Sequence, residues 1–305
     1  MSTVGTVRFS VVLGQWLDRS LAADLETAVL ADRLGYPQVW VPEMAKADSP
    51  TFAAHLVART ERIEPVLGPL AVTVRSAVQI AIAAQTVAAA GRPVHLAFGT
   101  SSTVVARWHR RRRTGAADLL AATTREVGEL LGGGRVEGFR LTEPPRPRPT
   151  LTVAAFGPRA VEVAASADRM VLNMVTASTA ARLAAEHPNT AVWLSAAIDP
   201  TDAERAWMAR GFVGYLAAPG YAEMFTEAGF GELVEFARTR PGPKEVYARM
   251  PPDLIDRVAL VGDESTVRRR IDEYRNAGVT EICIVAPAPD LPVAARTLEA
   301  LAPSD

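Results

Sequence analysis

The chain has 305 residues, of which 49% are hydrophobic and 22% charged, which predicts a folded protein with a large core. Its formal net charge of −1 argues against partners such as nucleic acid or an anionic membrane surface. No apolar run reaches the roughly 20 residues of a membrane span, and no signal-peptide pattern opens the chain, so we expect a cytoplasmic protein. The only cysteine, Cys283, excludes an intramolecular disulfide and a Cys-rich metal site, and no metal is expected. Lysine occurs only at Lys46 and Lys244 while arginine and alanine abound, which is typical of a GC-rich bacterial genome.

Apolar runs and helical segments alternate along the chain. Each predicted strand is an apolar or β-branched run bounded by turn residues. In chain order the predicted strands are residues 7–13, 38–41, 63–71, 94–98, 151–155, 169–173, 191–197 and 281–285. The predicted helices are residues 18–34 with Asp18 as N-cap, 49–60, 75–90, 116–131, 160–167, 178–186, 263–277 and 293–301.

Eight strands alternating with helices favour the α/β class and a (β/α)₈ TIM barrel, as a single domain over residues 1–305. A doubly wound open sheet is the runner-up, but no Gly-x-Gly-x-x-Gly follows the first strand. The alternation loosens at two places. After the fourth strand there is an insertion with a predicted basic loop at residues 107–113, and residues 201–247 predict a helical excursion between the seventh and eighth strands.

The turn after the fifth strand carries the clearest binding signal. Gly157 frees the turn, and Pro158 suits the first helical position because its missing N–H costs nothing there. The amides of Gly157, Arg159 and Ala160 are expected to be exposed at the helix N-terminus, and Arg159 adds positive charge. We therefore predict an anion site suited to a phosphate; an ordinary tight turn is the alternative.

Several short segments, taken together, resemble the luciferase-like superfamily and within it the F420-dependent oxidoreductases. They are ADRLGY (31–36), VWVPE (39–43), ARTERI (58–63), LAFGTSS (96–102), WH (108–109), AAFGPR (154–159), DRMV (168–171) and VGDEST (261–266). The resemblance spans nearly the whole chain. It implies a barrel with an insertion after strand four and a helical excursion after strand seven, coenzyme F420 or FMN at the strand C-termini, and a homodimer.

The resemblance also implies which residues contact the cofactor. Gly157, Arg159 and the backbone of Phe156 match the turn that holds the cofactor phosphate in relatives. Leu70 and Ala71 match the place where relatives carry a non-proline cis peptide that bulges against the deazaflavin ring. The further cofactor-binding candidates are Thr100, Ser101 and Asn173.

Two residues are candidates for catalysis. Glu43 follows the second strand at a position that is acidic or polar in relatives, and His109 is the only histidine in a loop expected on the active face. A capping or salt-bridging carboxylate is the alternative for Glu43, and a ring stacked on Trp108 is the alternative for His109. The candidate substrate-binding residues are Trp16, Met44 and Trp108.

Two departures from the family pattern weaken one reaction class. Met44 stands where many relatives place histidine, and Ser102 lies near where a sugar-phosphate dehydrogenase branch has glutamate. The usual acid–base pair of that branch is therefore missing, and alcohol oxidation of its kind is not expected.

The leading hypothesis is an F420H2-dependent reductase that delivers hydride to an electron-poor double bond of an organic substrate, such as a secondary metabolite. Arg107 and Arg110 to Arg113 would receive the oligoglutamate tail of F420, which FMN lacks. An FMN-dependent monooxygenase of the same superfamily is the first alternative. A catalytically silent barrel that binds a small molecule or a protein is the second.

Overall fold

The computed structural model describes residues 7–13, 19–43, 45–286 and 291–303, without the side chains of residues 291–293. Its strands are hydrogen-bonded in the order β6-β5-β4-β3-β2-β1-β9-β7-β8, and β6 also pairs with β7, so the sheet closes on itself. The fold is the predicted (β/α)₈ TIM barrel of the α/β class. The strands are β1 (Arg8–Val12), β2 (Gln38–Val41), β3 (Glu64–Ala71), β4 (His95–Gly99), β5 (Leu151–Ala154), β6 (Arg169–Asn173), β7 (Thr190–Ile198), β8 (Leu260–Gly262) and β9 (Glu281–Val285).

The eight predicted strands are confirmed as β1 to β7 and β9, with ends that differ by at most one residue. Strand β8 was not predicted, because its three residues are too few to show a periodic pattern. It pairs in parallel with the end of β7, where Ala197 lies opposite Val261.

The chain divides into two compact units whose boundaries fall inside β1 and β6. The N-terminal unit consists of Phe9–Val171 with Ala302–Asp305, and the C-terminal unit of Met1–Arg8 with Leu172–Leu301. Each is described by itself below.

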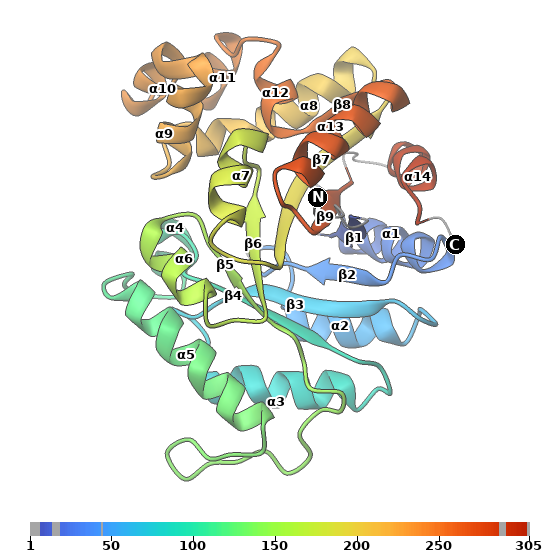
Figure 1. Cartoon of the computed structure of the whole chain (residues 1–305), viewed down its shortest axis with the longest axis vertical. Helices are drawn as coiled ribbons and strands as arrows, with labels where there is room; N and C mark the ends of the chain where they lie inside the picture. Colours follow the sequence, from blue (N-terminus) through green and yellow to red (C-terminus); the bar gives the residue numbers. More distant parts are fainter. Residues whose placement is uncertain (1–6, 14–18, 44, 287–290, 304–305) are drawn as a thin grey trace. The chain divides into compact units, whose positions relative to one another are not determined.

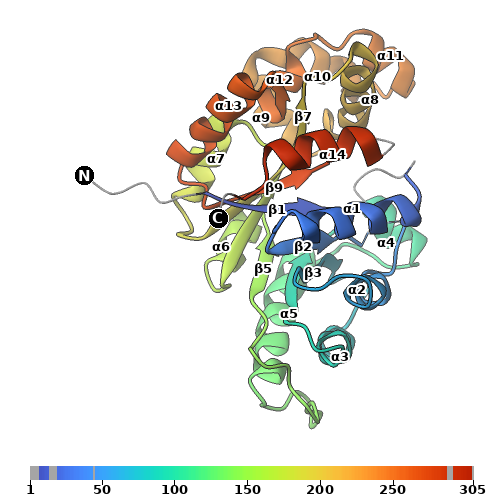
Figure 2. The ribbon, with the colours of Figure 1, turned by 90° about the vertical axis from the view of Figure 1, so that its right-hand side faces the viewer.

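In the N-terminal unit the helices form a row along the outside of the strands (Figures 1 and 2). Contacts run from α1 to α2, α2 to α3, α3 to α5 and α5 to α6, and α2 also packs on β2 and β3. Side chains of the strands, such as Trp40, Leu67 and Phe98, are fully buried. The helices are α1 (Leu21–Arg33), α2 (Ser49–Val57), α3 (Ala77–Ala88), α4 (Thr103–Trp108), α5 (Ala116–Leu131) and α6 (Pro158–Ala164).

Two local predictions in this unit are corrected. The N-cap of α1 is Ser20, whose hydroxyl accepts the N–H of Ala23 at 3.1 Å, and the predicted cap Asp18 lies outside the described residues. The predicted basic loop is partly helical, since α4 includes Arg107 and ends at Trp108. The hydroxyl of Ser102 caps α4 by accepting the N–H of Val105, and this capping explains why a helix begins there.

The C-terminal unit contains the predicted helical excursion, which runs from α8 to α12 between β7 and β8. All nine residues of β7 are buried, with α13 and α14 packed against the strand. Its helical segments are α7 (Ala177–Ala184), α8 (Asp202–Phe212), η1 (Val213–Tyr215), α9 (Tyr221–Phe225), η2 (Thr226–Phe230), α10 (Gly231–Arg238), α11 (Pro243–Ala248), α12 (Leu254–Val258), α13 (Glu264–Asn276) and α14 (Leu291–Ala300).

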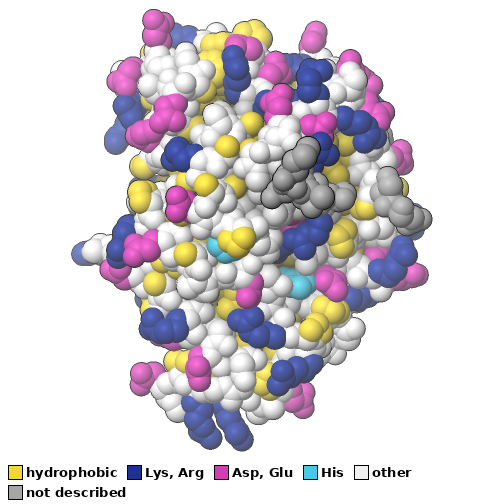
Figure 3. Space-filling model, viewed as in Figure 1, with side chains coloured by type: hydrophobic (Ala, Val, Ile, Leu, Met, Phe, Trp, Pro, Cys, Tyr) yellow, Lys and Arg dark blue, Asp and Glu magenta, His cyan; other side chains and the backbone are white. Residues whose placement is uncertain are grey.

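Positive and negative side chains are interspersed on the face shown in Figure 3, as the balanced composition predicts. Among the described residues, no helix combines the length and the apolarity that crossing a membrane requires.

Candidate active site

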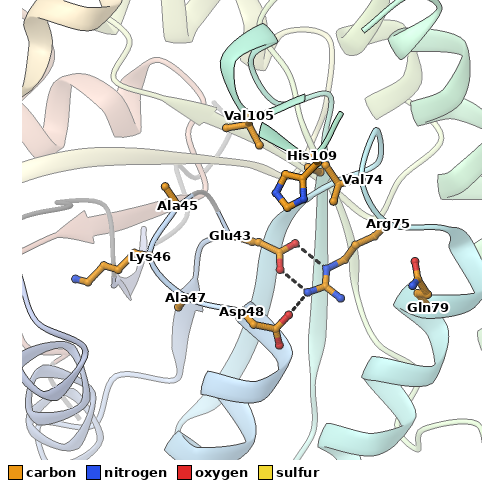
Figure 4. A pocket seen from close by; sticks show the side chains of 11 residues that line it. Glu43, Ala45, Lys46, Ala47, Asp48, Val74, Arg75, Gln79, Val105 and His109 are labelled. Carbon is orange, nitrogen blue, oxygen red and sulfur yellow. Dashed lines mark hydrogen bonds and ion pairs between the residues drawn. The ribbon is translucent and has the colours of Figure 1, made fainter. Parts of the chain in front are cut away.

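A pocket of about 420 Å³ lies in the N-terminal unit, where β2 and β3 end (Figure 4). Its wall includes the candidate catalytic residues Glu43 and His109 and the cofactor candidate Ala71. The carboxyl ends of the strands are where barrel enzymes place their active sites, and the volume suits a small molecule. The structure thus brings together three residues that lie far apart in the sequence.

Glu43 is held by an arginine that the sequence analysis did not single out. Arg75 Nε donates to Glu43 Oε2 at 2.7 Å, and Arg75 Nη2 donates to Glu43 Oε1 at 2.5 Å. The same Nη2 also donates to the carboxylate of Asp48. Such a two-bonded arginine–carboxylate pair is among the strongest and most directional ion pairs, so Glu43 is a fixed acceptor for Arg75.

The charges of this cluster shift two pKa values. The hydrogen bonds and charge of Glu43, with a contribution from Asp48, raise the pKa of Arg75 above its usual value despite burial. Burial raises the pKa of the Asp48 carboxyl, but hydrogen bonds from Thr51 and the charge of Arg75 outweigh it, and the pKa is lowered. The cluster therefore carries two negative charges and one positive charge.

A second ion cluster anchors the pocket rim to α1. Lys46, which lines the pocket, contacts Asp24 Oδ2 with its Nζ at 2.5 Å. On the other side, Arg19 Nε lies 3.7 Å from Asp24 Oδ1, and the side chains of Arg19 and Asp24 are 3% and 2% exposed. Losing Asp24 would leave Lys46 and the buried Arg19 without their shared carboxylate, so this cluster holds the connection after β2 in place.

The cis peptide bond in β3 does not lie where the family resemblance predicts it. The cis peptide lies at Gly68–Pro69, and Leu70–Ala71 is not among the cis bonds. Proline is the residue type for which the cis form is only slightly disfavoured, so a cis bond before Pro69 is favoured over one before Ala71. The pairing of β3 with β4 shifts register between Leu67 and Leu70. Beyond the bulge, Leu70 is fully buried and Ala71 lines the pocket.

The end of β4 is tied to the basic segment. Arg113 Nη2 donates to Thr100 Oγ1 at 2.6 Å, and Arg113 Nε donates to the Thr100 carbonyl at 3.4 Å. Ser101 follows with a φ of 56°, which turns the backbone sharply before α4. The structure thus brings the cofactor candidate Thr100 into contact with one of the arginines predicted to hold the F420 tail. The other four arginines predicted to hold the tail, Arg107 and Arg110 to Arg112, are exposed.

The Gly157 turn has some of the features predicted for an anion site and lacks others. Gly157 is the N-cap of α6, and a Cβ built there would have no heavy atom within 4 Å, so open space lies beside it. The Ala160 amide is not available, however, because it donates to the Gly157 carbonyl at 3.0 Å. The guanidinium of Arg159 contacts Asp118 at 2.9 Å and Glu162 at 3.2 Å, and all three side chains are exposed. Phe156 is half-buried.

Asn173, in the C-terminal unit, is held by a tyrosine of the excursion. Asn173 Nδ2 donates to the Tyr221 hydroxyl at 3.1 Å, and that hydroxyl donates to the Asn173 carbonyl at 3.0 Å. Burial raises the pKa of Tyr221, the Tyr215 ring beside it adds to the effect, and Asn173 opposes it. Tyr221 therefore remains a neutral donor and fixes the Asn173 amide.

The remaining candidates fall outside the pocket or outside the described residues. Trp16 and Met44 belong to the part of the chain that is not described. Trp108 is 56% exposed, and on α4 it is Val105 that lines the pocket. Sequence reasoning missed Arg75, Lys46, Asp48 and Gln79 in the pocket wall. The scarcity of lysine was the only available signal for Lys46, and the Ser76-x-x-Gln79 capping pattern was the signal for Gln79. Arg75 gave no local signal, because its partner Glu43 lies 32 residues away.

Comparison with known proteins adds a family and a fold. The family model for luciferase-like monooxygenases matches residues 6–281. None of the curated proteins compared with the sequence matches it.

Solved structures of similar fold include enzymes with two different cofactors. The coenzyme F420-dependent tetrahydromethanopterin reductase from Methanopyrus kandleri has a TM-score of 0.78 and 14% identity, covering 98% of both chains. An F420-dependent secondary alcohol dehydrogenase in complex with an F420-acetone adduct has a TM-score of 0.74 and 16% identity, covering 97% of this chain and 98% of the other. An FMN complex of the oxygenating constituent of 3,6-diketocamphane monooxygenase from Pseudomonas putida has a TM-score of 0.71 and 15% identity, covering 97% of both chains. At these identities the likeness establishes the fold.

Proposed function

Because the chain belongs to the luciferase-like monooxygenase family, we propose that it is an F420-dependent oxidoreductase, working as an F420H2-dependent reductase of an electron-poor double bond. The observation that carries the proposal is the pocket at the ends of β2 and β3, where His109, the proposed proton source, lines the wall together with the Arg75–Glu43 pair. A reductase needs a proton donor as well as a hydride donor, and histidine is the side chain best suited to give a proton near neutrality.

The chain's own residues fit a phosphate-bearing deazaflavin. The open space beside Gly157 lets a phosphate approach the first turn of α6, which a side chain at this position would obstruct. The exposed arginines after α4 supply positive charge for an anionic tail, and Arg113 connects this segment to Thr100 at the end of β4. When bound, the deazaflavin would supply the hydride.

His109 and Glu43 take different roles in this proposal. The His109 ring is exposed, lines the pocket and makes no hydrogen bond within the described residues, so it is available to hold a proton for the substrate. Both oxygens of Glu43 accept from Arg75, so we assign Glu43 to positioning this arginine. Asn173, fixed by Tyr221, remains a proposed cofactor contact.

An FMN-dependent monooxygenase is the second candidate, because the FMN complex of the Pseudomonas putida enzyme shares the fold. The anionic tail separates the two candidates, since F420 carries oligoglutamate and FMN does not.

The test is a parallel binding titration of the full-length protein with F420 and with FMN, each followed by fluorescence. We expect saturable F420 binding that weakens as salt is raised, and FMN binding that is weaker and less dependent on salt. Binding of FMN alone, together with oxygen-dependent turnover of a reduced flavin, would favour the monooxygenase. If neither cofactor binds, the proposal is wrong and the silent barrel is favoured.

A further inference from the structure

Arg75 has one nitrogen whose donors are not used by the protein. Its Nε and Nη2 serve Glu43 and Asp48, and within the described residues Nη1 makes no hydrogen bond. In Figure 4 the nitrogen of Arg75 without a dashed line faces away from the two carboxylates, on the side of Gln79. Two N–H donors are therefore offered to the pocket in a fixed direction, because the other two nitrogens lock the guanidinium plane.

Gln79 offers a second pair of donors on the same wall. Its Oε1 accepts the N–H of Ser76 at 3.1 Å and the Ser76 hydroxyl at 3.4 Å, as the capping box of α3 requires. Of the two ends of a side-chain amide only the oxygen can accept a backbone N–H, so this contact fixes which end of the Gln79 amide is nitrogen. Nε2 makes no hydrogen bond within the described chain, and Gln79 lines the pocket.

The charge of the cluster decides which acceptor these donors suit. The Arg75 guanidinium faces two carboxylates, those of Glu43 and Asp48, which together more than balance its charge. Lys46, the other cation of the pocket wall, is paired with Asp24. An anion on Nη1 would gain one attraction and meet two repulsions at short range, whereas an uncharged oxygen avoids that repulsion.

We propose that Arg75 Nη1 and Gln79 Nε2 form a substrate subsite for an uncharged oxygen acceptor, that of a ketone, ester or amide, and that the subsite discriminates against carboxylates. The inference deepens the proposed function by naming the substrate class, and its binding test does not need the cofactor.

The probes are trans-cinnamamide and trans-cinnamate, which share a ring and a conjugated double bond and differ in the charge of the terminal group. Ligand-observed NMR titration of the purified full-length protein, at low salt and without cofactor, gives the dissociation constants. We expect cinnamamide to bind about tenfold more tightly than cinnamate. Equal affinities, tighter binding of cinnamate, or no saturable binding of cinnamamide would overturn the subsite.

The variants are chosen so that folding and binding can be separated. Gln79→Glu keeps an acceptor for the Ser76 N–H, and glutamate is a common residue in a capping box, so its melting temperature should stay near that of the wild type. It removes the donors, and cinnamamide affinity should fall about tenfold. Gln79→Met removes the donors without adding charge and should lose affinity similarly. Unchanged affinity in both folded variants would refute the role of Gln79.

The matched control is Gln85→Glu on the same helix. Gln85 Oε1 also accepts a backbone N–H, that of Glu143 at 3.0 Å, but the residue is not part of the pocket wall. This variant should bind both probes as the wild type does; a loss equal to that of Gln79→Glu would show a non-local charge effect and overturn the subsite. A separate F420 titration distinguishes the proposals, since selective cinnamamide binding without F420 binding would sink only the proposed function.

Discussion

The carboxylate of Asp32 accepts the backbone N–H of Ile63 at 2.7 Å, across 31 residues of sequence. The same carboxylate accepts the N–H groups of Glu61 at 2.7 Å and Arg62 at 2.9 Å. Asp32 lies at the end of α1 and is 7% exposed, so it fixes the chain where it enters β3. These hydrogen bonds join two of the segments on which the family resemblance rests, ADRLGY (31–36) and ARTERI (58–63).

Asp32→Asn should lower the free energy of unfolding by about 1–3 kcal/mol, because the single amide oxygen cannot replace both carboxylate oxygens and leaves a part-buried N–H unpaired. Chemical denaturation measures the change. Asp118→Asn is the control, since Asp118 pairs with Arg159 at the surface and its loss should cost about 0–0.5 kcal/mol. Similar effects of the two variants would contradict the structural role of Asp32.

The stability conferred by Asp32 should depend on pH in a defined direction. Burial raises the pKa of Asp32, but the N–H groups of Glu61, Ile63 and Arg62 and the charge of Arg62 outweigh it, so the folded-state pKa is lowered. The contribution is therefore complete above the unfolded-state pKa of about 3.9 and is lost as the pH falls towards the folded-state value. The stability gap between wild type and Asp32→Asn should be constant from pH 7 to 5 and shrink below about pH 4. A gap that shrinks between pH 7 and 5 would contradict this assignment.

Gly157→Val should weaken cofactor binding by about tenfold or more while leaving the melting temperature nearly unchanged. The new side chain would enter open space, since nothing lies within 4 Å of a Cβ at Gly157. Gly68→Ala is the contrasting variant, because Gly68 has a φ of 109° and its Cβ would overlap the Leu70 backbone and lie 2.5 Å from the Ala97 carbonyl. It should cost about 3 kcal/mol of stability. Unaltered affinity in Gly157→Val would refute the phosphate site.

The triple variant Arg110→Ser, Arg111→Ser, Arg112→Ser should reduce F420 affinity and flatten its dependence on salt. Each exposed contact is worth roughly 0–1 kcal/mol, and salt screens it. Arg113 is left unchanged, because its contact with Thr100 would otherwise mix a structural effect into the result. FMN affinity measured in parallel should not respond. If the salt dependence for F420 is the same in both proteins, the tail lies elsewhere.

His109→Gln should reduce turnover by about 10²–10⁴-fold with cofactor affinity retained, as expected on loss of a proton donor. Single-turnover kinetics and a binding titration separate the two quantities. His55→Gln serves as the control, because His55 is exposed on α2 and takes no part in the pocket. Wild-type turnover in His109→Gln would show that His109 is not the proton donor and that solvent supplies the proton.

The sequence by itself determined most of the elements and their order, but not β8 or α4. Strand β7, helix α5 and the capped start of α13 at Asp263 produce signals within a few residues, since periodicity and capping are local properties. The prediction that Glu43 and His109 lie near each other also followed from the barrel topology, in which strand ends meet at one rim, and both residues line the same pocket.

What only the tertiary structure decided is which side chains meet. Glu43 and Arg75 are 32 residues apart and come together because β2 and β3 are neighbours in register, a pairing that no local pattern encodes. The same holds for Lys46 with Asp24, and for Arg159, whose charge is directed to Asp118 and Glu162. Hydrogen bonds and ion pairs require donor–acceptor distances that are correct to within a few tenths of an ångström, and those distances are set only once the strands have paired.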